Sequence, residues 1–246
     1  MTPPVTISVV VPTHQRRERV RALLDALGRQ TFPPSRTEVI VSIDGSTDGT
    51  REALQQLQTA FALRTVWRPR AGRASALNAG LEMASGDLVV LLDDDMEPVP
   101  TCLEAHWQAH QSGTRLGVMG AVPVVIDPHA RPATRYIGEK FNRHLTNLAD
   151  NRRPLLLTDF YSGNFSIARD VLKEVGGFDE DFKDYGNEDL ELALRLERAG
   201  VTLVYEATAC AAQHNDKAFS ALAADSVAEG RTAVLFAVKH PDVIDR

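Results

Sequence analysis

The sequence predicts an α/β fold: a mostly parallel, Rossmann-like sheet with helices on both faces, forming a single globular domain in two halves. Three observations predict it. Apolar, β-branched runs alternate with segments of helical periodicity through residues 5–92. The runs are apolar at nearly every position, as in strands that are buried on both faces. The chain has 246 residues, 43% of them hydrophobic, which is enough to bury a sizeable core.

The first half gives the more regular pattern. We expect strands over residues 5–11, 38–43, 63–67 and 87–92. Between them we expect one helix over 16–27, a second that begins after an N-cap at Ser46 or Thr47, and a third over 74–83. In a parallel sheet, ligands bind beyond the carboxyl ends of the strands. Asp44 and the triplet Asp93–Asp95 each follow one of these strands. Two acidic strand ends at one edge of the sheet indicate a site.

The second half is less regular. We expect a helix over 99–111, a strand over 115–122, a short helix after 162–167, a helix over 188–199, a strand over 201–205 and a terminal helix over 219–238. Residues 123–153 are polar, interrupted by proline and rich in His and Arg. They are expected to form a long loop, and long loops are often functional.

Composition excludes several classes of protein. The net charge of -6, from 33 acidic and 27 basic residues, argues against a protein that coats nucleic acid. The apolar runs are too short to cross a bilayer, and the first residues lack the charged leader of a signal peptide. Cys102 and Cys210 form neither a disulfide framework nor a zinc site on their own, and we expect two buried, reduced thiols. These features predict a cytoplasmic protein.

The triplet Asp93–Asp95 is the strongest chemical signal. Adjacent carboxylates repel one another and are disfavoured in a sheet, so the arrangement needs a compensating partner. Hard divalent cations such as Mg²⁺ and Mn²⁺ prefer oxygen ligands of this kind, and such a cation can also bind a diphosphate. The alternative is an acidic first turn of a helix that begins near Pro98.

A second acidic pair, Glu188 and Asp189, follows Asn187. Asn187 has the character of an N-cap, and acidic residues are ordinary in the first turn of a helix. Opposite a metal site, however, such a pair would supply a general base that takes the proton of an attacking alcohol.

Four further residues have two interpretations each. Asp44 caps a turn with Gly45 or bonds to a ligand. His214 is structural or a metal ligand. Arg73, before a helix, reaches a phosphate or is solvated, and Asn78, in that helix, contacts a ligand or the strand edge.

Five segments together resemble the family-2 glycosyltransferases, which have a GT-A fold. They occur in the expected order over almost the whole chain: VVVPTHQRRERVRALLDAL, VIVSIDGSTDGT, GRASALNAGLEMASGDLVVLLDDD, SGNFSIARDVLKEVGGFDEDF and YGNEDLELALRLERAG. Each is a weak signal alone, whereas five in order are highly specific. The resemblance implies a nucleotide-sugar-binding half over residues 1–98 and an acceptor-binding, catalytic half over 99–246.

The resemblance also implies roles for individual residues. On the nucleotide side it places Pro12 and Thr13 beside the nucleotide and Asp44 on the base or ribose. The triplet matches the aspartate-x-aspartate motif, with Asp93 toward the nucleotide and sugar, Asp94 next to it, and Asp95 on a Mn²⁺ or Mg²⁺ ion.

On the acceptor side, Asp189 matches the catalytic base, and Glu188 helps to place the acceptor or the sugar. Gly163 and Asn164 match a loop that lines the donor sugar, and His214 resembles a histidine that completes the metal site. His14 and Gln15 depart from the usual pair and leave base selectivity open. The Gln-x-x-Arg-Trp motif of processive synthases is absent from the sequence.

The expected function is therefore that of a metal-dependent, inverting, non-processive glycosyltransferase. It would use a nucleoside-diphosphate sugar and a saccharide, lipid-linked or small-molecule acceptor. A nucleotidyltransferase is the rival enzyme class, although its glycine-rich phosphate loop is missing after the first strand. A non-catalytic module that binds a nucleotide-sugar or a metal is the third option. Contact with a membrane surface and the oligomeric state are left open.

The basic residues of 123–153 lead to one further expectation. They include Arg135, Arg143, Arg152 and Arg153 in an otherwise acidic chain. Arginine binds phosphate and carboxylate bidentately, so an anionic acceptor is one hypothesis for this segment. A solvated loop is the other.

Overall fold

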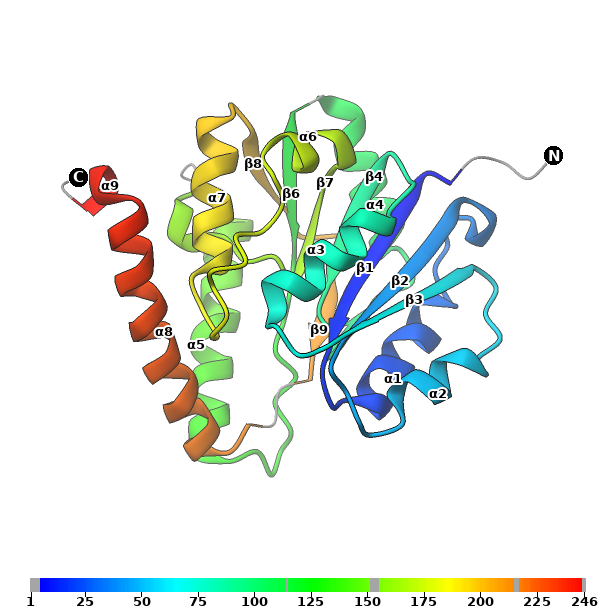
Figure 1. Cartoon of the computed structure of the whole chain (residues 1–246), viewed down its shortest axis with the longest axis horizontal. Helices are drawn as coiled ribbons and strands as arrows, with labels where there is room; N and C mark the ends of the chain where they lie inside the picture. The colour runs from blue at the N-terminus through cyan, green and yellow to red at the C-terminus, as the bar shows by residue number, and fades with distance from the viewer. Residues whose placement is uncertain (1–4, 114, 151–154, 215–216, 245–246) are drawn as a thin grey trace.

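A seven-stranded sheet organises the chain in the computed structural model, which describes residues 5–113, 115–150, 155–214 and 217–244 (Figure 1). Its strand order is β3-β2-β1-β4-β7-β6-β8. The strands are β1 (Ile7–Thr13), β2 (Thr37–Asp44), β3 (Ala62–Arg68), β4 (Leu88–Leu92), β6 (Leu116–Gly120), β7 (Asn164–Ala168) and β8 (Thr202–Glu206). Only β7 runs antiparallel to its neighbours, β4 and β6. The expected mostly parallel α/β sheet is confirmed.

Helices cover both faces of this sheet. They are α1 (Arg17–Leu27), α2 (Thr50–Gln55), α3 (Arg73–Met83), α4 (Cys102–Ala109), α5 (Pro132–Ala149), α6 (Arg169–Glu174), α7 (Glu188–Arg198), α8 (Phe219–Lys239) and α9 (Pro241–Ile244). Short 3-10 turns lie at Pro34–Arg36, His110–Ser112 and Leu157–Asp159, and a two-stranded sheet pairs β5 (Met96–Pro98) with β9 (Ala211–Gln213).

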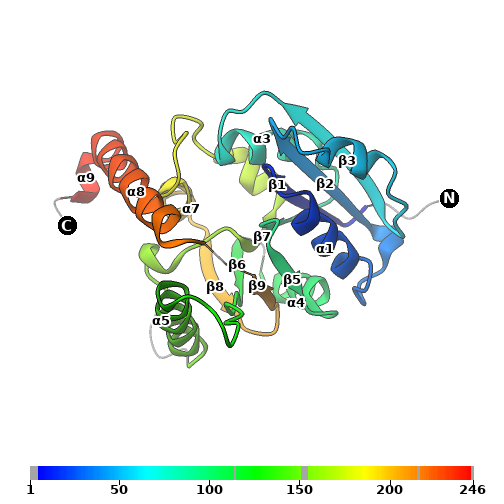
Figure 2. The same ribbon diagram turned by 90° about the horizontal axis from the view of Figure 1, so that it is seen from below.

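Two apolar clusters fill the space between sheet and helices. One joins the β1 side chains of Val9 and Val11 to α1 and α4. The other joins Val10, the residue between them, to α3, α6 and α7 on the opposite face. This alternation follows from the two-residue period of a strand, and Figure 2 shows α1 and α3 on opposite sides of β1 and β2. Both clusters contain residues from the two expected halves, which share one sheet.

The antiparallel strand β7 brings a distant segment to the acidic triplet. Asn164, its first residue, pairs with Leu92, the last residue of β4. The backbone N–H of Asp93 donates to the carbonyl of Gly163, 3.0 Å away. A Cβ atom at position 163 would lie 2.6 Å from Asp93 Oδ2, so any larger residue there would have to displace the Asp93 carboxylate.

Several expectations about local structure are wrong. Residues 132–149 form α5 instead of a loop, because apolar residues recur at helical spacing among the basic ones and Pro132 starts the helix. Helix α2 begins at Thr50 with Gly49 as its N-cap, so neither Ser46 nor Thr47 caps it. Arg73 is the first residue of α3.

Two further features bear on the expected class of protein. Cys102 is buried as expected, whereas Cys210 is partly exposed, and both are free thiols. Among the residues that the structure describes, none of the helices combines the length and the apolar character needed to span a membrane.

Candidate active site

The carboxyl ends of β1, β2 and β4 meet at one edge of the sheet. Thr13 ends β1, Asp44 ends β2, and the triplet Asp93–Asp95 directly follows β4. The parallel register of β1 with both neighbours sets these ends side by side. The sequence-predicted acidic edge therefore exists in the structure.

Arg73 connects this edge to the second half of the chain. Its Nη2 donates to Asp93 Oδ1 at 2.9 Å and to Ser162 Oγ at 3.0 Å. Its Nη1 donates to Asp189 Oδ1 at 3.1 Å and to Glu188 Oε1 at 3.4 Å. Burial alone would lower the pKa of Arg73, but the charges of the three carboxylates outweigh burial and raise the pKa well above its ordinary value. Arg73 is therefore a permanent cation at the centre of the site.

Asp189 is held by Ser162 as well as by Arg73. The Ser162 hydroxyl donates to Asp189 Oδ1 at 2.5 Å, and the Ser162 N–H donates to Oδ2 at 3.2 Å. These bonds fix the carboxylate at the start of α7. Asp189 is thereby held in one orientation beside the α5–α8 face of the site.

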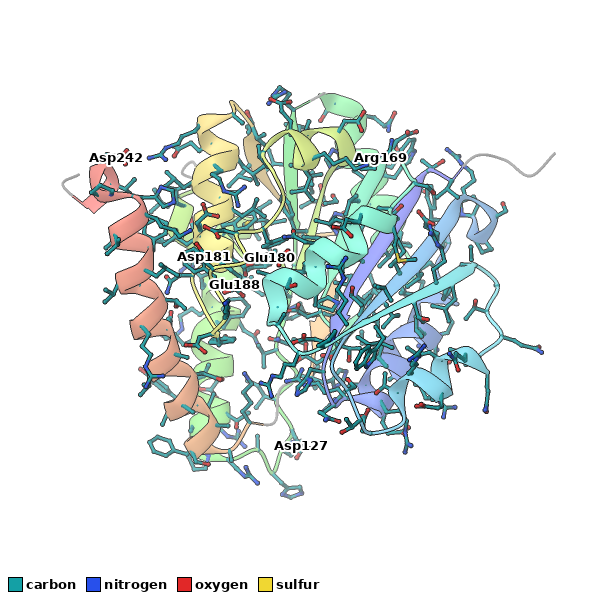
Figure 3. All side chains as sticks on the ribbon, in the orientation of Figure 1. Asp127, Arg169, Glu180, Asp181, Glu188 and Asp242 are labelled. Atoms are coloured by element: carbon teal, nitrogen blue, oxygen red, sulfur yellow. The ribbon has the colours of Figure 1, made fainter. Side chains whose placement is uncertain are left out.

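Glu188 lies beside Asp189 in a drier environment. Its side chain is 6% exposed, and its Oε2 has no hydrogen-bond partner within the described residues. Burial, and next the charge of Asp189, raise the pKa of Glu188 to about 7. Figure 3 shows Glu188 at the start of α7, between that helix and α3.

Asn187 precedes this pair but does not cap α7 with its side chain. Its backbone is left-handed, with φ 63°. Its Nδ2 donates instead to the Glu229 carbonyl and to Thr232 Oγ1 of α8, both at 2.9 Å. The expected N-cap role is therefore limited to the backbone position.

The rest of the triplet is compensated by Arg16. Its Nη1 donates to Asp94 Oδ1 at 2.8 Å and lies 3.4 Å from Asp95 Oδ2. Thr13 Oγ1 donates to Asp94 Oδ2 at 2.7 Å. Burial raises the pKa of Asp94 to about 6 against the opposing effect of these two partners, and burial followed by the charge of Asp93 raises the pKa of Asp95.

His214 contacts Asp95 with its backbone and not with its ring. The His214 N–H donates to the Asp95 carbonyl at 2.9 Å, while its Nε2 pairs with Glu97 Oε2 at 2.7 Å. Within the described part of the chain, no three His, Cys, Asp or Glu side chains converge to form a ready metal site. The carboxylates of Asp93 and Asp95 still suit a hard cation. They repel one another, which a bound cation would offset, and both side chains are partly accessible.

Asp44, Asn78 and Asn164 make contacts that fix the backbone. The Asp44 carboxylate accepts from the N–H groups of Ala71 and Gly72, at 2.7 and 3.2 Å, and so positions the loop before Arg73. Asn78 bonds to the N–H and carbonyl of Phe178, each at 2.9 Å, away from the triplet. The nucleotide contacts expected of Asp44 and Asn78 stay predictions.

Asn164 is fully buried behind Gly163. Its Nδ2 donates to the carbonyls of Ala121 and Ala209, and its Oδ1 accepts from His106 Nε2 at 2.9 Å. His106 Nδ1 accepts in turn from Ser166 Oγ at 2.8 Å. These contacts are inside the core, so Gly163 reaches the site while Asn164 supports it from behind. The sugar contact expected of Asn164 stays a prediction.

Two cavities open on this constellation. The first, here called the sheet-edge cavity, is about 700 Å³ and is lined by Pro12, Thr13, Asp44, the triplet and the cations Arg16, Arg70, Arg73, Lys183 and Lys217. The second, the α5–α8 cavity, is about 540 Å³ and is lined by residues of α5 and α8 together with Gly163 and Asp189. Both volumes are typical of ligand sites. Arg73, Asp93, Tyr185 and Glu188 line both cavities, so the cavities meet there.

Sequence reasoning did not identify Arg16 or Ser162 as site residues. Arg16 follows the first strand, where a cation opposite an acidic strand end could have been noticed. Ser162 lies within a quoted motif, but serine has no distinctive spacing, and its partner Asp189 is 27 residues away. Only the antiparallel placement of β7 brings Ser162 and Asp189 together.

The sequence matches two families of known proteins. Residues 8–176 match the model of glycosyl transferase family 2, and residues 143–214 match that of the N-terminal domain of galactosyltransferase. Validoxylamine A glucosyltransferase of Streptomyces hygroscopicus subsp. limoneus is 30% identical over 223 residues, which cover 80% of this chain and 49% of that protein. The chain spans about half the length of such curated relatives.

Solved structures give the same result. The mannosyltransferase PcManGT from Pyrobaculum calidifontis, in complex with GDP-Man and Mn2+, superposes with a TM-score of 0.70 at 26% identity, covering 90% of this chain and 60% of that one. S. aureus TarS 1-349 in complex with UDP-GlcNAc has a TM-score of 0.66 at 16% identity, covers 87% and 60%, and shows the shared fold alone. With the family match over most of its length, the chain belongs to glycosyl transferase family 2.

Proposed function

We propose that this chain transfers a sugar from a nucleoside-diphosphate sugar to an acceptor hydroxyl, with inversion, with a divalent cation, and one sugar at a time. The observation that carries the proposal is the meeting of the two cavities at Arg73, Asp93 and Glu188, beside Asp189. A donor in one cavity and a hydroxyl in the other would face each other across this point.

The sheet-edge cavity suits the donor. Five cations line it, and two of them, Arg16 and Arg73, contact the carboxylates that follow β4, where a diphosphate would lie. Pro12, Thr13 and Asp44 line the part where the nucleoside would lie. The relative PcManGT, which was solved with GDP-Man and Mn2+, supports this class of donor.

The triplet is the proposed place of the cation. Asp95 and Asp93 would hold it, and His214 would join them after releasing Glu97. A bound Mn²⁺ or Mg²⁺ supplies Lewis-acid stabilisation of the departing diphosphate. Arg73 and Arg16 lie against the same carboxylates and add positive charge at the leaving group.

Asp189 is the proposed base. The acceptor oxygen attacks the anomeric carbon as the bond from that carbon to the diphosphate breaks, and the hydroxyl proton passes to the Asp189 carboxylate. One direct displacement inverts the anomeric carbon. Ser162 and Arg73 hold Asp189 in place for this transfer, and Glu188 helps to position the acceptor.

A panel of nucleotide-sugars with Mn²⁺ tests the proposal. Release of a nucleoside diphosphate supports it, and the product's anomeric configuration and length, read by NMR and mass spectrometry, test inversion and single addition. A parallel incubation with nucleoside triphosphates and sugar 1-phosphates tests the rival class, and pyrophosphate release there would favour the nucleotidyltransferase instead. Saturable binding without turnover of any donor would favour the non-catalytic module.

A further inference from the structure

The α5–α8 cavity has a charged part and an apolar part. Arg73 and Asp93 lie where it meets the sheet-edge cavity, beside Asp189. Apolar lining comes from four separate parts of the fold: Val122 and Val124 after β6, Ile137 and Phe141 on α5, Leu190 on α7, and Leu222 on α8. Figure 2 shows α5 and α8 at the same end of the molecule.

Helix α5 presents its apolar side to this cavity. Thr134, Ile137, Gly138 and Phe141 recur at the spacing of one helical face and all line the cavity. Arg135 and Arg143 are exposed and are not part of the lining, and Arg135 bonds to the Pro128 carbonyl. Arg152 and Arg153 lie outside the described residues.

Three polar side chains of the lining, those of Tyr161, Thr134 and Asn187, are already engaged within the protein. The Tyr161 hydroxyl donates to the Gly120 carbonyl at 2.6 Å, and Thr134 Oγ1 donates to the Lys217 carbonyl at 3.3 Å. Asn187 is bonded to α8. These groups hold the wall together, so they offer few bonds to the many hydroxyls of a purely saccharide acceptor.

The charge of the lining also opposes an anionic acceptor. Asp93, Glu188, Asp189 and Glu229 line the cavity, and Arg73, its cation, already pairs with the first three. A phosphate or carboxylate there would meet more negative than positive charge. By contrast, Ile137 is 42% exposed although it lines the cavity, so its apolar surface is available to a ligand.

We infer that the acceptor carries an apolar alkyl or aryl group next to its reacting hydroxyl, and that this group packs against Ile137, Phe141 and Leu222. The hydroxyl then faces Asp189. The inference rests on the proposed function and names the acceptor class for that same site.

Isothermal titration with defined glucosides tests this class without requiring turnover. The probes are methyl, n-octyl and phenyl β-D-glucopyranoside, each titrated below any micelle-forming concentration. Burial of one methylene changes a dissociation constant about fourfold, so n-octyl glucoside should bind at least about tenfold more tightly than methyl glucoside. Tight binding of the phenyl compound alone would assign an aryl group, and of the octyl compound alone an alkyl group. Equal affinity of all three would overturn the inference.

Variants locate the binding. Ile137→Asn should weaken n-octyl or phenyl glucoside about tenfold and leave methyl glucoside unchanged. The matched control is Val234→Asn. Val234 is an apolar residue of α8 that is 65% exposed and lies outside the cavity lining. The double variant Arg135→Ala, Arg143→Ala should also leave binding unchanged. Equal effects of Ile137→Asn and Val234→Asn would contradict the proposed location.

Failure of the proposed function gives a different result. Nucleoside diphosphate release from a donor in water, measured without any glucoside, tests the transferase chemistry alone. Donor turnover with no preference for apolar glucosides overturns only the acceptor inference. Absence of turnover with every donor overturns the proposed function.

Discussion

Replacing Arg73 by methionine removes the cation that three carboxylates share. Methionine keeps much of the side-chain length but has no charge and no donor. Asp93, Glu188 and Asp189 would then face one another with the nearest positive charge lost. Removing one partner from a buried ion pair costs about 3–5 kcal/mol. We expect about 3 kcal/mol, at the low end, because the Asp93 and Asp189 side chains are 30% and 26% exposed.

The stability that Arg73→Met loses should be greater at higher pH. Burial and Asp189 raise the pKa of Glu188 to about 7, above its unfolded value. Its unfavourable contribution is therefore absent below the unfolded pKa, grows as the pH rises from there, and is complete above about pH 7. The charge of Arg73 limits that shift. Without Arg73 the pKa of Glu188 should rise further, so the variant should lose more stability at pH 8 than at pH 5.

Urea unfolding of the wild type and of Arg73→Met at pH 5 and pH 8 measures both quantities. Arg115→Met is the control, since Arg115 makes a bidentate pair with Glu174 at the surface, and a smaller, pH-independent loss is expected. An Arg73→Met loss that is equal at the two pH values, or no greater than that of the control, would refute the account of Arg73 as the shared cation.

Three further predictions concern the cation, the base and the buried core. Excess chelator should abolish turnover, Mn²⁺ or Mg²⁺ should restore it, and Asp95→Ala should lose metal-dependent nucleotide binding in titration; full activity in chelator would exclude the cation. Asp189→Asn should lower the turnover rate about a hundredfold or more with donor affinity retained, and near-normal turnover would leave Asp189 only a structural role. Burial lowers the pKa of His106 to about 4, so the stability from its neutral ring is complete above about pH 6.5 and falls by up to about 3 kcal/mol as the pH drops toward 4. Urea unfolding should show that the free energy of unfolding of His106→Gln falls less steeply than that of the wild type between pH 6.5 and 4. Equal slopes for the two proteins would contradict the lowered pKa of His106.

Much of the fold follows from local patterns. The strands β1 and β4 could be predicted because they are nearly continuous apolar runs, and α1 because its apolar residues recur at helical spacing. For β2, β3 and α3 the alternation of strand and helix segments was the guide. Helix α5 was missed although its apolar residues recur at helical spacing, because the many basic and polar residues and the prolines of 123–153 favoured a loop. The antiparallel direction of β7 has no signal in its own residues, since direction depends on the neighbouring strands.

The site residues likewise include some that could be predicted from the sequence and some that could not. Asp44 and Asp93 could be placed because a parallel sheet gathers strand ends at one edge. The contact of Arg73 with Asp189 joins positions 116 residues apart and depends on where α7 packs. The full burial of Asn164 could not be predicted, because an asparagine in a sequence does not by itself indicate a core position.

The bond between Asn187 and α8 links local unfolding to the catalytic pair. Thr232 and Phe236 are the buried residues of α8, a 21-residue helix that is otherwise mostly exposed. Helices with little buried surface open at lower free energy than the core of a sheet. Each opening of α8 would remove one wall of the α5–α8 cavity and also release Asn187 and the turn before Glu188. Native-state hydrogen exchange should therefore find the amides of α8 and of the first turn of α7 in one cooperative unit, which opens ahead of β1 and β4.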